Sequence, residues 1–237
     1  MSGLIVSVRT EEEADRAIEG GATLLDVKEP RNGSLGRPPA EVIQSILAQV
    51  AGRMPVSAAM GELLETPHLP PRHGLEYVKW GLAGYGGKDW GGAMIATRKE
   101  LERRHFTCRP VAVAYADWKL ACAPLPNSIC DFACDCRFDV LLVDTWEKNG
   151  TTLLDWMSLS QLFGVAEQCR FSKTRLALAG SLGPSEIAEL SSLEPDWFAV
   201  RGAVCQGGAR GSTIDTSAVR QIADVASGRS TSARAES

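Results

Sequence analysis

Short apolar runs alternate with amphipathic stretches along almost the whole chain of 237 residues. The apolar runs have strand length, and the stretches between them repeat apolar residues at helical spacing. Strands are predicted over 4–9, 23–28, 55–60, 77–82, 110–117, 139–145, 175–181 and 197–203. Helices are predicted over 11–20, 38–50, 68–74, 91–104, 126–136, 153–168, 183–193 and 215–227. Eight strand–helix repeats predict the α/β class and one eight-stranded (β/α)8 barrel of the TIM type.

The domain organisation follows from this repeat pattern. Residues 1–227 are predicted to form one barrel, the candidate catalytic domain, and the Ser-, Ala- and Arg-rich segment 228–237 is predicted to be a disordered tail. An open, doubly wound sheet is the alternative architecture. It is disfavoured because no Gly-x-Gly-x-x-Gly motif follows the first predicted strand.

Polar residues gather on one face of the predicted strands. Alternate residues of a strand share a face, and one face is almost entirely apolar, which suits packing against helices. The other face carries polar residues that mostly lie near the carboxyl ends of the strands, namely Ser7, Asp26, Lys28, Ser57, Lys79, Asp117, Asp144, Ser181 and Arg201. Barrel enzymes place their chemistry at this end, so these side chains are expected to face the barrel mouth.

Lysines and carboxylates dominate this polar set. Lys28 and Lys79 lie at strand ends, and Lys148 follows the sixth strand. A lysine attacks a carbonyl only as the neutral amine, and burial or neighbouring cations lower its pKa toward neutrality. Asp26, Asp117 and Asp144 are the matching carboxylates. The alternative is an ion-pair network that only fills polar space, but the gathering of the whole set at strand ends favours catalysis.

Glycine-rich segments follow the last two predicted strands, as AGSLGPSE and VRGAVCQGGARGS. Barrels often bind phosphate after these strands, through backbone N–H groups and a nearby helix start. The turns need glycine in any case, yet their position favours an anion site. The predicted substrate and phosphate ligands are Ser57, Asp117, Gly180, Ser181, Arg201, Gly202 and Ala203.

Composition narrows the class of protein. Hydrophobic residues make up 44% of the chain, and the net charge of −4 does not suggest a nucleic-acid binder. No apolar run reaches the roughly 20 residues of a membrane span, and the first residues lack a signal-peptide plan, so a cytoplasmic protein is expected. The acids of 11–13 suit a solvated helix start.

Cysteine is the remaining candidate for metal chemistry. Three of the seven cysteines lie close together in the sequence, at Cys130, Cys134 and Cys136. Zinc sites usually show a fuller set of Cys and His ligands. The sequence therefore favours cysteines used as small apolar residues on a helix, and no metal site is predicted.

Six motifs together resemble one known family. They are, in chain order, DVKEPRNGSLG, VKWGLAG, AYAD, LLVDTWEKNGTTLLDW, LALAGSL and VRGAVC. They resemble the (5-formylfuran-3-yl)methyl phosphate synthases, also called 4-(hydroxymethyl)-2-furancarboxaldehyde-phosphate synthases, over about residues 4–222. The family comprises aldolase-like barrels, classed as carbon–oxygen lyases acting on phosphates. The resemblance implies that two molecules of the triose phosphate glyceraldehyde 3-phosphate are joined, with loss of phosphate and water, in methanofuran-type cofactor biosynthesis.

The resemblance also implies roles for particular residues. The Schiff-base lysine of the family falls on Lys28, its second active-site lysine on Lys79, and its Asp-x-x-x-Lys pair on Asp144 and Lys148. Asp26 would assist Lys28, and the imine would act as the electrophile, so that no metal or cofactor is required. The segment 61–74 departs from the family pattern.

Two other functions remain open at this point. The same lysines would serve a class I aldolase or an isomerase of triose phosphates, and analysis of the product separates these from a furan synthase. A non-catalytic barrel that binds a phosphorylated ligand would bind without turnover. No nucleic-acid or membrane partner is expected, and a homo-oligomer is neither required nor excluded by the sequence.

Overall fold

Eight parallel strands close into a barrel in which every strand pairs with its neighbours in chain order, in a computed structural model that describes residues 1–65 and 69–229. The strands are β1 (Gly3–Val8), β2 (Leu24–Val27), β3 (Val56–Glu62), β4 (Tyr77–Gly81), β5 (Arg109–Tyr115), β6 (Val140–Asp144), β7 (Arg175–Leu178) and β8 (Trp197–Val200). β1 pairs with β8 and completes the ring. The predicted (β/α)8 barrel is therefore confirmed.

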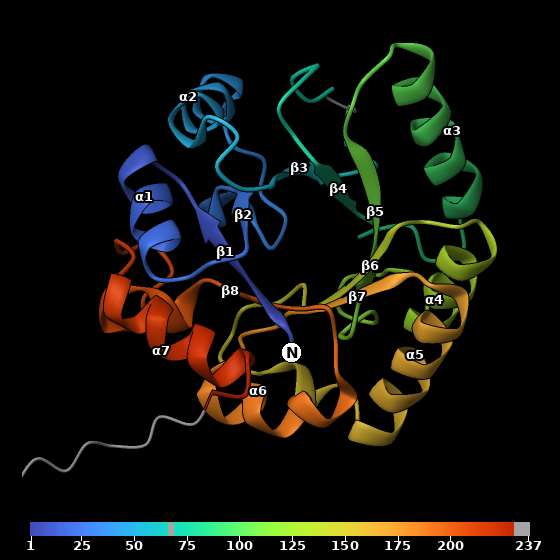
Figure 1. The fold of residues 1–237 in the computed structure, drawn as a ribbon. Coiled ribbons are helices and arrows are strands. Elements are labelled where there is room, and N and C mark those ends of the chain that lie inside the picture. The colour runs from blue at the N-terminus through green and yellow to red at the C-terminus, as the bar shows by residue number, and fades with distance from the viewer. Residues whose placement is uncertain (66–68, 230–237) are drawn as a thin grey trace, which may run out of the picture.

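Helices surround the barrel on its outside (Figure 1). They are α1 (Glu11–Glu19), α2 (Ala40–Val50), α3 (Trp90–Arg103), α4 (Pro126–Asp135), α5 (Leu159–Ser172), α6 (Pro184–Leu190) and α7 (Thr216–Ala226). Local sequence fixes several of their starts. Thr10, Asp89 and Asp215 each accept a hydrogen bond from a backbone N–H of the first turn, which satisfies donors that have no partner inside the helix.

Two predicted helices differ in the structure. No helix is present over 69–76, between β3 and β4, so the helix predicted over 68–74 is wrong for the residues described; His68 lies outside them. Pro70 and Pro71 explain this, because proline lacks the amide donor of a helix interior and restricts the residue before it.

The helix predicted over 153–168 is also interrupted. Leu153–Asp155 form a 3-10 turn, and α5 begins only at Leu159. Ser158 caps the new start, with its Oγ accepting from Gln161 N at 3.3 Å while the Gln161 side chain accepts from Ser158 N at 2.9 Å. This reciprocal pair is a capping box, and it sets the true helix start inside the predicted one.

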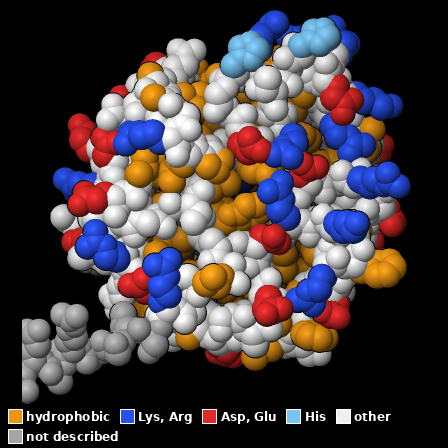
Figure 2. All heavy atoms as spheres, viewed as in Figure 1, with side chains coloured by type: hydrophobic (Ala, Val, Ile, Leu, Met, Phe, Trp, Pro, Cys, Tyr) orange, Lys and Arg blue, Asp and Glu red, His pale blue; other side chains and the backbone are white. Residues whose placement is uncertain are grey.

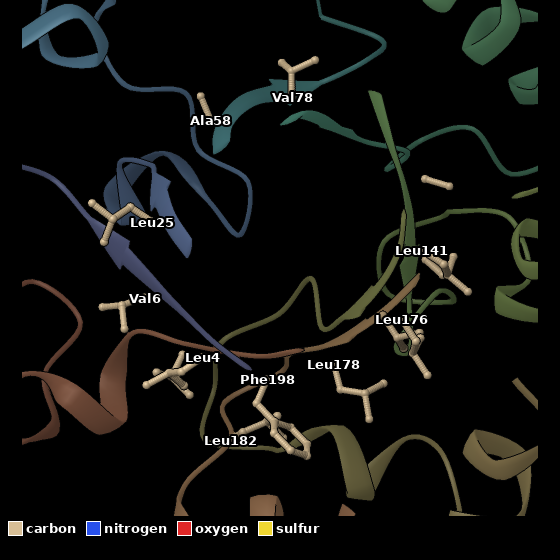
Figure 3. Packing of buried hydrophobic residues seen from close by; sticks show 14 of the residues in the cluster. Leu4, Val6, Leu25, Ala58, Val78, Leu141, Leu176, Leu178, Leu182 and Phe198 are labelled. Atoms are coloured by element: carbon tan, nitrogen blue, oxygen red, sulfur yellow. The ribbon is translucent and has the colours of Figure 1, made fainter. Parts of the chain in front are cut away.

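Alternation along the strands separates two apolar layers. Outward-facing residues form the large core between strands and helices, and Figure 3 shows several of them directed away from the strands. Those labelled there are Leu4, Val6, Leu25, Ala58, Val78, Leu141, Leu176, Leu178, Leu182 and Phe198. A second cluster fills the barrel interior with residues such as Ile5, Leu24, Tyr77, Val113, Leu142 and Ala177. The predicted faces are therefore confirmed, and the interior packing supports the polar residues above it.

Glu13 corrects the expectation of a solvated start for α1. Its side chain is buried, and its carboxylate forms an ion pair with Arg201, with Oε2 2.5 Å from Nη1 and Oε1 3.0 Å from Nη2. Arg9 N also donates to Oε2 at 2.8 Å. Burial alone would raise the pKa of Glu13, but the hydrogen bond and charge of Arg201 outweigh it and hold that pKa below its ordinary value. The acid at position 13 therefore joins α1 to the loop after β8.

Glu13→Gln is expected to destabilise the fold by about 3–5 kcal/mol, because it leaves the buried Arg201 guanidinium without its counter-charge. Urea unfolding at neutral pH measures this change. Glu12→Gln, at an exposed neighbouring position, should stay within about 0.5 kcal/mol. Equal stability of the two variants would show that the buried pair contributes nothing to stability.

The surface and the chain end complete the description of the fold. Figure 2 shows acidic and basic side chains interspersed over the face that it displays, with hydrophobic side chains near its centre. Among the described residues, no helix combines the length and hydropathy needed to span a bilayer. α7 ends at Ala226, and residues 230–237 of the predicted tail lie outside the described part of the chain.

Candidate active site

A cleft of about 530 Å³ opens at the carboxyl ends of the strands. It is lined by the following predicted site residues: Asp26, Lys28, Lys79, Asp144, Lys148, Gly180, Ser181, Arg201, Gly202 and Ala203. Two predicted residues, Ser57 and Asp117, are not part of this lining but hydrogen-bond to groups that belong to it or lie beside it. The polar residues at the strand ends therefore meet in one place. This follows because alternate residues of each strand face inward and the eight strands close into a ring.

Asp26 and Lys79 form a buried ion pair on the β2–β4 side of the cleft. Lys79 Nζ lies 2.8 Å from Asp26 Oδ1. Ser57 Oγ donates to Oδ1 at 2.8 Å and Ser7 Oγ to Oδ2 at 3.2 Å, as expected from the register that aligns these residues on β1, β2 and β3. Burial would raise the pKa of Asp26, but the charges of Lys79 and Lys28 outweigh it and hold the pKa below its ordinary value. Asp26 is therefore an anion at neutral pH.

Asp144 and Lys148 form the second pair, on the β6 side. Lys148 Nζ lies 2.8 Å from Asp144 Oδ1 and 2.8 Å from Thr145 Oγ1. Burial opposes ionisation of Asp144, but Lys148 and Lys28 outweigh it and keep its pKa well below the usual range. The pair therefore holds one carboxylate and one ammonium side by side at the cleft wall.

Lys28 differs from the other two lysines. Lys28 is a buried residue, 7% exposed, and its amine lies close enough to Asp26 and Asp144 to feel both charges. Yet this amine makes no hydrogen bond or ion pair with any residue in the described part of the chain. Burial lowers the pKa of Lys28 to about 7, because the opposing charges of Asp144 and Asp26 only partly compensate and Arg210 and Lys79 lower it further. A substantial fraction of this amine is therefore neutral at physiological pH.

Ser34 connects the loop after β2 to the β6 side of the cleft. Its side chain is buried, and Oγ donates to Thr145 O at 2.8 Å and lies 3.2 Å from Asp144 Oδ2. The same loop packs tightly at Gly36, where a Cβ atom would lie 2.1 Å from Glu29 O. Sequence reasoning did not single out Ser34, because a serine between glycines reads as an ordinary turn residue.

Asp117 positions the loop that carries Lys148. Its Oδ1 accepts from Trp146 N at 2.7 Å and its Oδ2 from Glu147 N at 2.8 Å. Both carboxylate oxygens thus hold backbone amides immediately before Lys148. The geometry supports a positioning role for Asp117 more directly than the substrate contact expected from the sequence.

The loops after β7 and β8 form the other wall of the cleft. Gly180 and Ser181 both adopt positive φ, at 107° and 55°, a conformation that is uncommon for residues other than glycine. Gly202 and Ala203 lie in a 3-10 turn, Gly202–Val204. All four line the cleft, and successive residues with such backbone geometry can present N–H groups to an anion.

Arg201 is engaged by the protein itself. Besides Glu13, its guanidinium donates to the backbone carbonyls of Ser7 at 2.8 Å, Arg210 at 2.9 Å and Ser212 at 3.1 Å. A guanidinium has five N–H donors, and all of them are used. Arg201 therefore shapes the loop after β8 and has no donor left for a phosphate.

Arg210, which sequence reasoning missed, is a second arginine of the cleft. It lines the cleft, and its guanidinium makes no hydrogen bond with any described residue. Burial lowers the pKa of Arg210, although the negative charge of Asp144 opposes this, and the group remains a cation at neutral pH. The sequence feature that could have identified Arg210 is an arginine within the glycine-rich segment after the last predicted strand.

Glu62 and Tyr115 form a further polar pair that the sequence did not suggest. Tyr115 Oη donates to Glu62 Oε1 at 2.7 Å, and Ala83 N donates to Oε2 at 2.8 Å. Burial raises the pKa of Glu62, with the hydrogen bonds from Tyr115 and Ala83 opposing it. A Cβ at Gly81 would lie 2.1 Å from Glu62 Oε2 and 2.2 Å from Tyr115 Oη, so glycine is required where the three strands bring these groups together.

Metal ligands do not gather in this cleft. Within residues 1–65 and 69–229, the group of His, Cys, Asp and Glu ligand atoms close enough for an ion is Cys130, Cys134 and Cys169. None of these cysteines lines the cleft. The cleft offers an amine, carboxylates, ammonium groups, a guanidinium and the backbone of the loops after β7 and β8.

Solved structures with the same fold confirm the architecture. Thiamine phosphate pyrophosphorylase from Pyrococcus furiosus aligns with a TM-score of 0.62 at 14% identity, covering 96% of each chain. The 3-hexulose-6-phosphate synthase from Salmonella typhimurium aligns with a TM-score of 0.61 at 18% identity, covering 96% of this chain and 100% of the other. At such identities the likeness shows the fold alone.

Sequence relatives define the family. The family model described as 4-HFC-P synthase matches residues 4–223. The (5-formylfuran-3-yl)methyl phosphate synthase of Methanothermobacter thermautotrophicus is 32% identical, covering 94% of this chain and 98% of its own. The synthase of the same name from Methanococcus maripaludis is 34% identical, with the same shares covered. The chain described here therefore belongs to the 4-HFC-P synthase family of (5-formylfuran-3-yl)methyl phosphate synthases.

Proposed function

We propose that this enzyme joins two molecules of glyceraldehyde 3-phosphate into (5-formylfuran-3-yl)methyl phosphate through a Schiff base on Lys28. The name of its relatives supports the product. The observation that carries the assignment of the nucleophile is the contrast among the three lysines of the cleft. Lys79 and Lys148 are held as ion pairs, whereas Lys28 is buried without a partner among the described residues and has a pKa lowered to about 7.

The first steps need a neutral amine and a proton source. One triose phosphate isomerises to its ketone form, and Lys28 Nζ adds to the ketone carbonyl and then expels water to give an imine. Protonation of the imine makes it an electron sink, so that loss of a proton from the adjacent carbon gives an enamine. Expulsion of phosphate from this enamine gives the imine of a three-carbon keto aldehyde, whose methyl carbon loses a proton to form a second enamine. The terminal carbon of this enamine attacks the central carbonyl carbon of the second triose phosphate, also in its ketone form, and so forms the branched carbon skeleton of the product.

Later steps release the leaving groups. After phosphate has left the first unit, the terminal hydroxyl of the second unit adds to the imine carbon, and the amine of Lys28 leaves as the ring forms. Loss of the remaining tertiary hydroxyl as water makes the furan aromatic. Mass balance between two triose phosphates and the product requires one phosphate and two water molecules. Asp144 with Lys148 can accept and donate protons beside the imine, since their oxygen and nitrogen atoms are 2.8 Å apart. Asp26 and Lys79 form the matching pair on the other side.

The substrate phosphates are assigned to the part of the cleft formed by the loops after β7 and β8. Gly180, Ser181, Gly202 and Ala203 offer backbone there, and Arg210 offers a guanidinium that is not used by described residues. Arginine is well suited to phosphate because its planar donors bind two oxygens at once. The phosphate of the bound product would occupy the same position.

Arg210→Ala is expected to raise KM for glyceraldehyde 3-phosphate about tenfold or more, the loss of a charge-assisted hydrogen bond of roughly 1.5–3 kcal/mol. Steady-state kinetics measure it. Turnover at saturation should fall less, because Arg210 is placed on the phosphate and not on the reacting carbons. Arg220→Ala, at an exposed position of α7, is the matched control. An unchanged KM would remove Arg210 from the phosphate site.

Identification of the product tests the proposed function. The enzyme is incubated with glyceraldehyde 3-phosphate, the products are identified by mass and inorganic phosphate is quantified. One furan aldehyde phosphate per phosphate released supports the proposal. A sugar bisphosphate without phosphate release indicates a simple aldolase, dihydroxyacetone phosphate alone indicates an isomerase, and binding without any product indicates a ligand-binding barrel.

A further inference from the structure

Three cysteines meet between α4 and α5, away from the catalytic cleft. Cys130 and Cys134 lie on α4 and Cys169 on α5, and their sulfur atoms are all within 4.8 Å of one another. Cys130 and Cys169 are buried and Cys134 is partly exposed. The sequence grouped Cys136 with the first two, but the third member in space is Cys169, 35 residues after Cys134 in the numbering.

We propose that Cys130, Cys134 and Cys169 form a site for a thiophilic divalent ion of the Zn²⁺ type, which joins α4 to α5. Thiolates are the ligands that such ions prefer. Three protein sulfurs leave the fourth position of a tetrahedral ion for a water molecule. This site is separate from the chemistry proposed for Lys28.

The spacing of the three sulfurs suits such an ion. Residues i and i+4 of a helix are neighbours on one face, which directs Cys130 and Cys134 to the same side of α4. Zinc–sulfur bonds of about 2.3 Å in tetrahedral geometry put the sulfurs about 3.8 Å apart. From separations of at most 4.8 Å, the thiols need to approach by about 1 Å or less, which side-chain rotation can provide.

An open approach exists on the Cys134 side. A cleft of about 490 Å³ borders Cys134, and its polar lining comprises Ser172, Thr174, three basic residues (Arg137, Lys173 and Arg175) and one acid, Asp139. A divalent ion with three thiolates carries a net charge of −1, and the basic residues of this cleft lower the cost of that charge. The cleft therefore provides an entry path, room for a water ligand and compensating charge.

The Cys134 thiol has a contact that an ion would replace. Its Sγ donates to Gln168 O, on α5, at 3.8 Å. Metal ions bind cysteine as the thiolate, so binding would release the thiol protons and end this contact.

The position of the site predicts what the ion does. α4 and α5 end at Asp135 and Ser172, just before β6 and β7 begin at Val140 and Arg175. The cysteines therefore lie toward the amino-terminal end of the barrel, which in TIM barrels serves stability, whereas catalysis takes place at the opposite end. Binding of the ion is expected to raise the melting temperature and to leave turnover nearly unchanged.

Titration of the reduced, full-length enzyme with Zn²⁺ against a chromophoric chelator tests the proposal. One ion per chain is expected, and Cd²⁺ should give a thiolate charge-transfer band in the ultraviolet. Cys134→Ser and Cys169→Ser should each weaken Zn²⁺ binding at least about 100-fold. Loss of a metal ligand should cost more affinity than the roughly 10- to 100-fold lost when a residue that only supports a ligand is removed. Cys136→Ser is the matched control on the same helix end and should bind like the unchanged enzyme.

Several results would overturn the site. Zn²⁺ binding that is unchanged by Cys134→Ser and Cys169→Ser, or that is lost in Cys136→Ser, rejects it, as does the absence of a Cd²⁺–thiolate band in the unchanged enzyme. Cys134 is partly exposed, so its serine variant should fold without metal, and circular dichroism checks this. Removal of the metal by chelation should change the turnover of every folded variant by no more than about twofold. A larger loss that added Zn²⁺ restores would show that the ion serves catalysis and not stability alone.

Discussion

Lys28→Arg is expected to abolish both turnover and covalent trapping while the barrel stays folded. Borohydride added to the unchanged enzyme during reaction with a triose phosphate should reduce the imine to a stable amine on Lys28. The arginine variant keeps the positive charge, but a guanidinium remains protonated and cannot add to a carbonyl. We expect turnover to fall at least about a thousandfold, as is usual when a covalent nucleophile is removed.

Mass spectrometry of the trapped protein checks the position of the adduct. Peptide mapping should place the reduced adduct on the segment that contains Asp26, Val27 and Lys28. Lys88→Arg, at an exposed position, is the matched control and should keep full activity and trapping. If Lys28→Arg remains active, the three lysines form an ion network that needs only charge; trapping on Lys79 or Lys148 would reassign the nucleophile.

The same amine predicts how initial-rate trapping depends on pH. Because burial lowers the pKa of Lys28 to about 7, the neutral fraction grows as the pH rises through 7 and is small below about pH 6. Trapping at subsaturating substrate should therefore rise with pH across this range and level off above it. Trapping on an exposed lysine would instead rise only as the pH approaches the ordinary pKa of lysine, about 10.4.

Asp144→Asn and Lys148→Ala are expected to lower turnover by about a hundredfold or more each, the usual scale for groups that transfer protons. They should act differently from Lys28→Arg, because the nucleophile remains. The anion of Asp144 raises the pKa of Lys28 against the effect of burial. Its loss should therefore lower that pKa further, and Asp144→Asn should still form the imine at neutral pH.

Trapping and turnover measured on the same samples separate these roles. In Asp144→Asn, borohydride should still label Lys28 while product formation falls. Asp131→Asn and Lys119→Ala, both at exposed positions, serve as charge-matched controls. Loss of trapping in step with turnover would mean that Asp144 is needed for imine formation itself, and full activity in the folded fraction of either variant would make the pair structural.

The barrel could be read from the sequence because its strands have two distinct faces. Leu25 and Val27 face the helices while Leu24 and Asp26 face inward, and a period of two records this directly. Two helix predictions were wrong in whole or in part because the composition favoured a helix where local sequence prevented or delayed one. Pro70 and Pro71 leave no helix over 69–76, and the Ser158–Gln161 capping box starts α5 late. These effects act over a few residues, whereas periodicity averages over many.

The candidate site could be read only in part. Position on a strand placed the three lysines at the mouth, but it could not show that Lys79 and Lys148 are paired while Lys28 lacks a partner among described residues. That difference depends on distances of a few ångströms across the barrel. Arg201 was taken as a phosphate ligand because it follows a strand, but Glu13, 188 positions earlier, engages it. Arg210 was missed because a loop has no periodicity.

The hydrogen bonds of Arg201 have a consequence for how this enzyme could change its specificity. The loop after β8 is held through the backbone carbonyls of Arg210 and Ser212, and carbonyls are the same for every amino acid. The side chains of Gln206 and Ala209, which are exposed and flank two glycines with positive φ, can therefore be exchanged while the anchor stays in place. A library randomised there should keep its folded yield, and it offers a starting point for evolving acceptance of aldehydes other than triose phosphates.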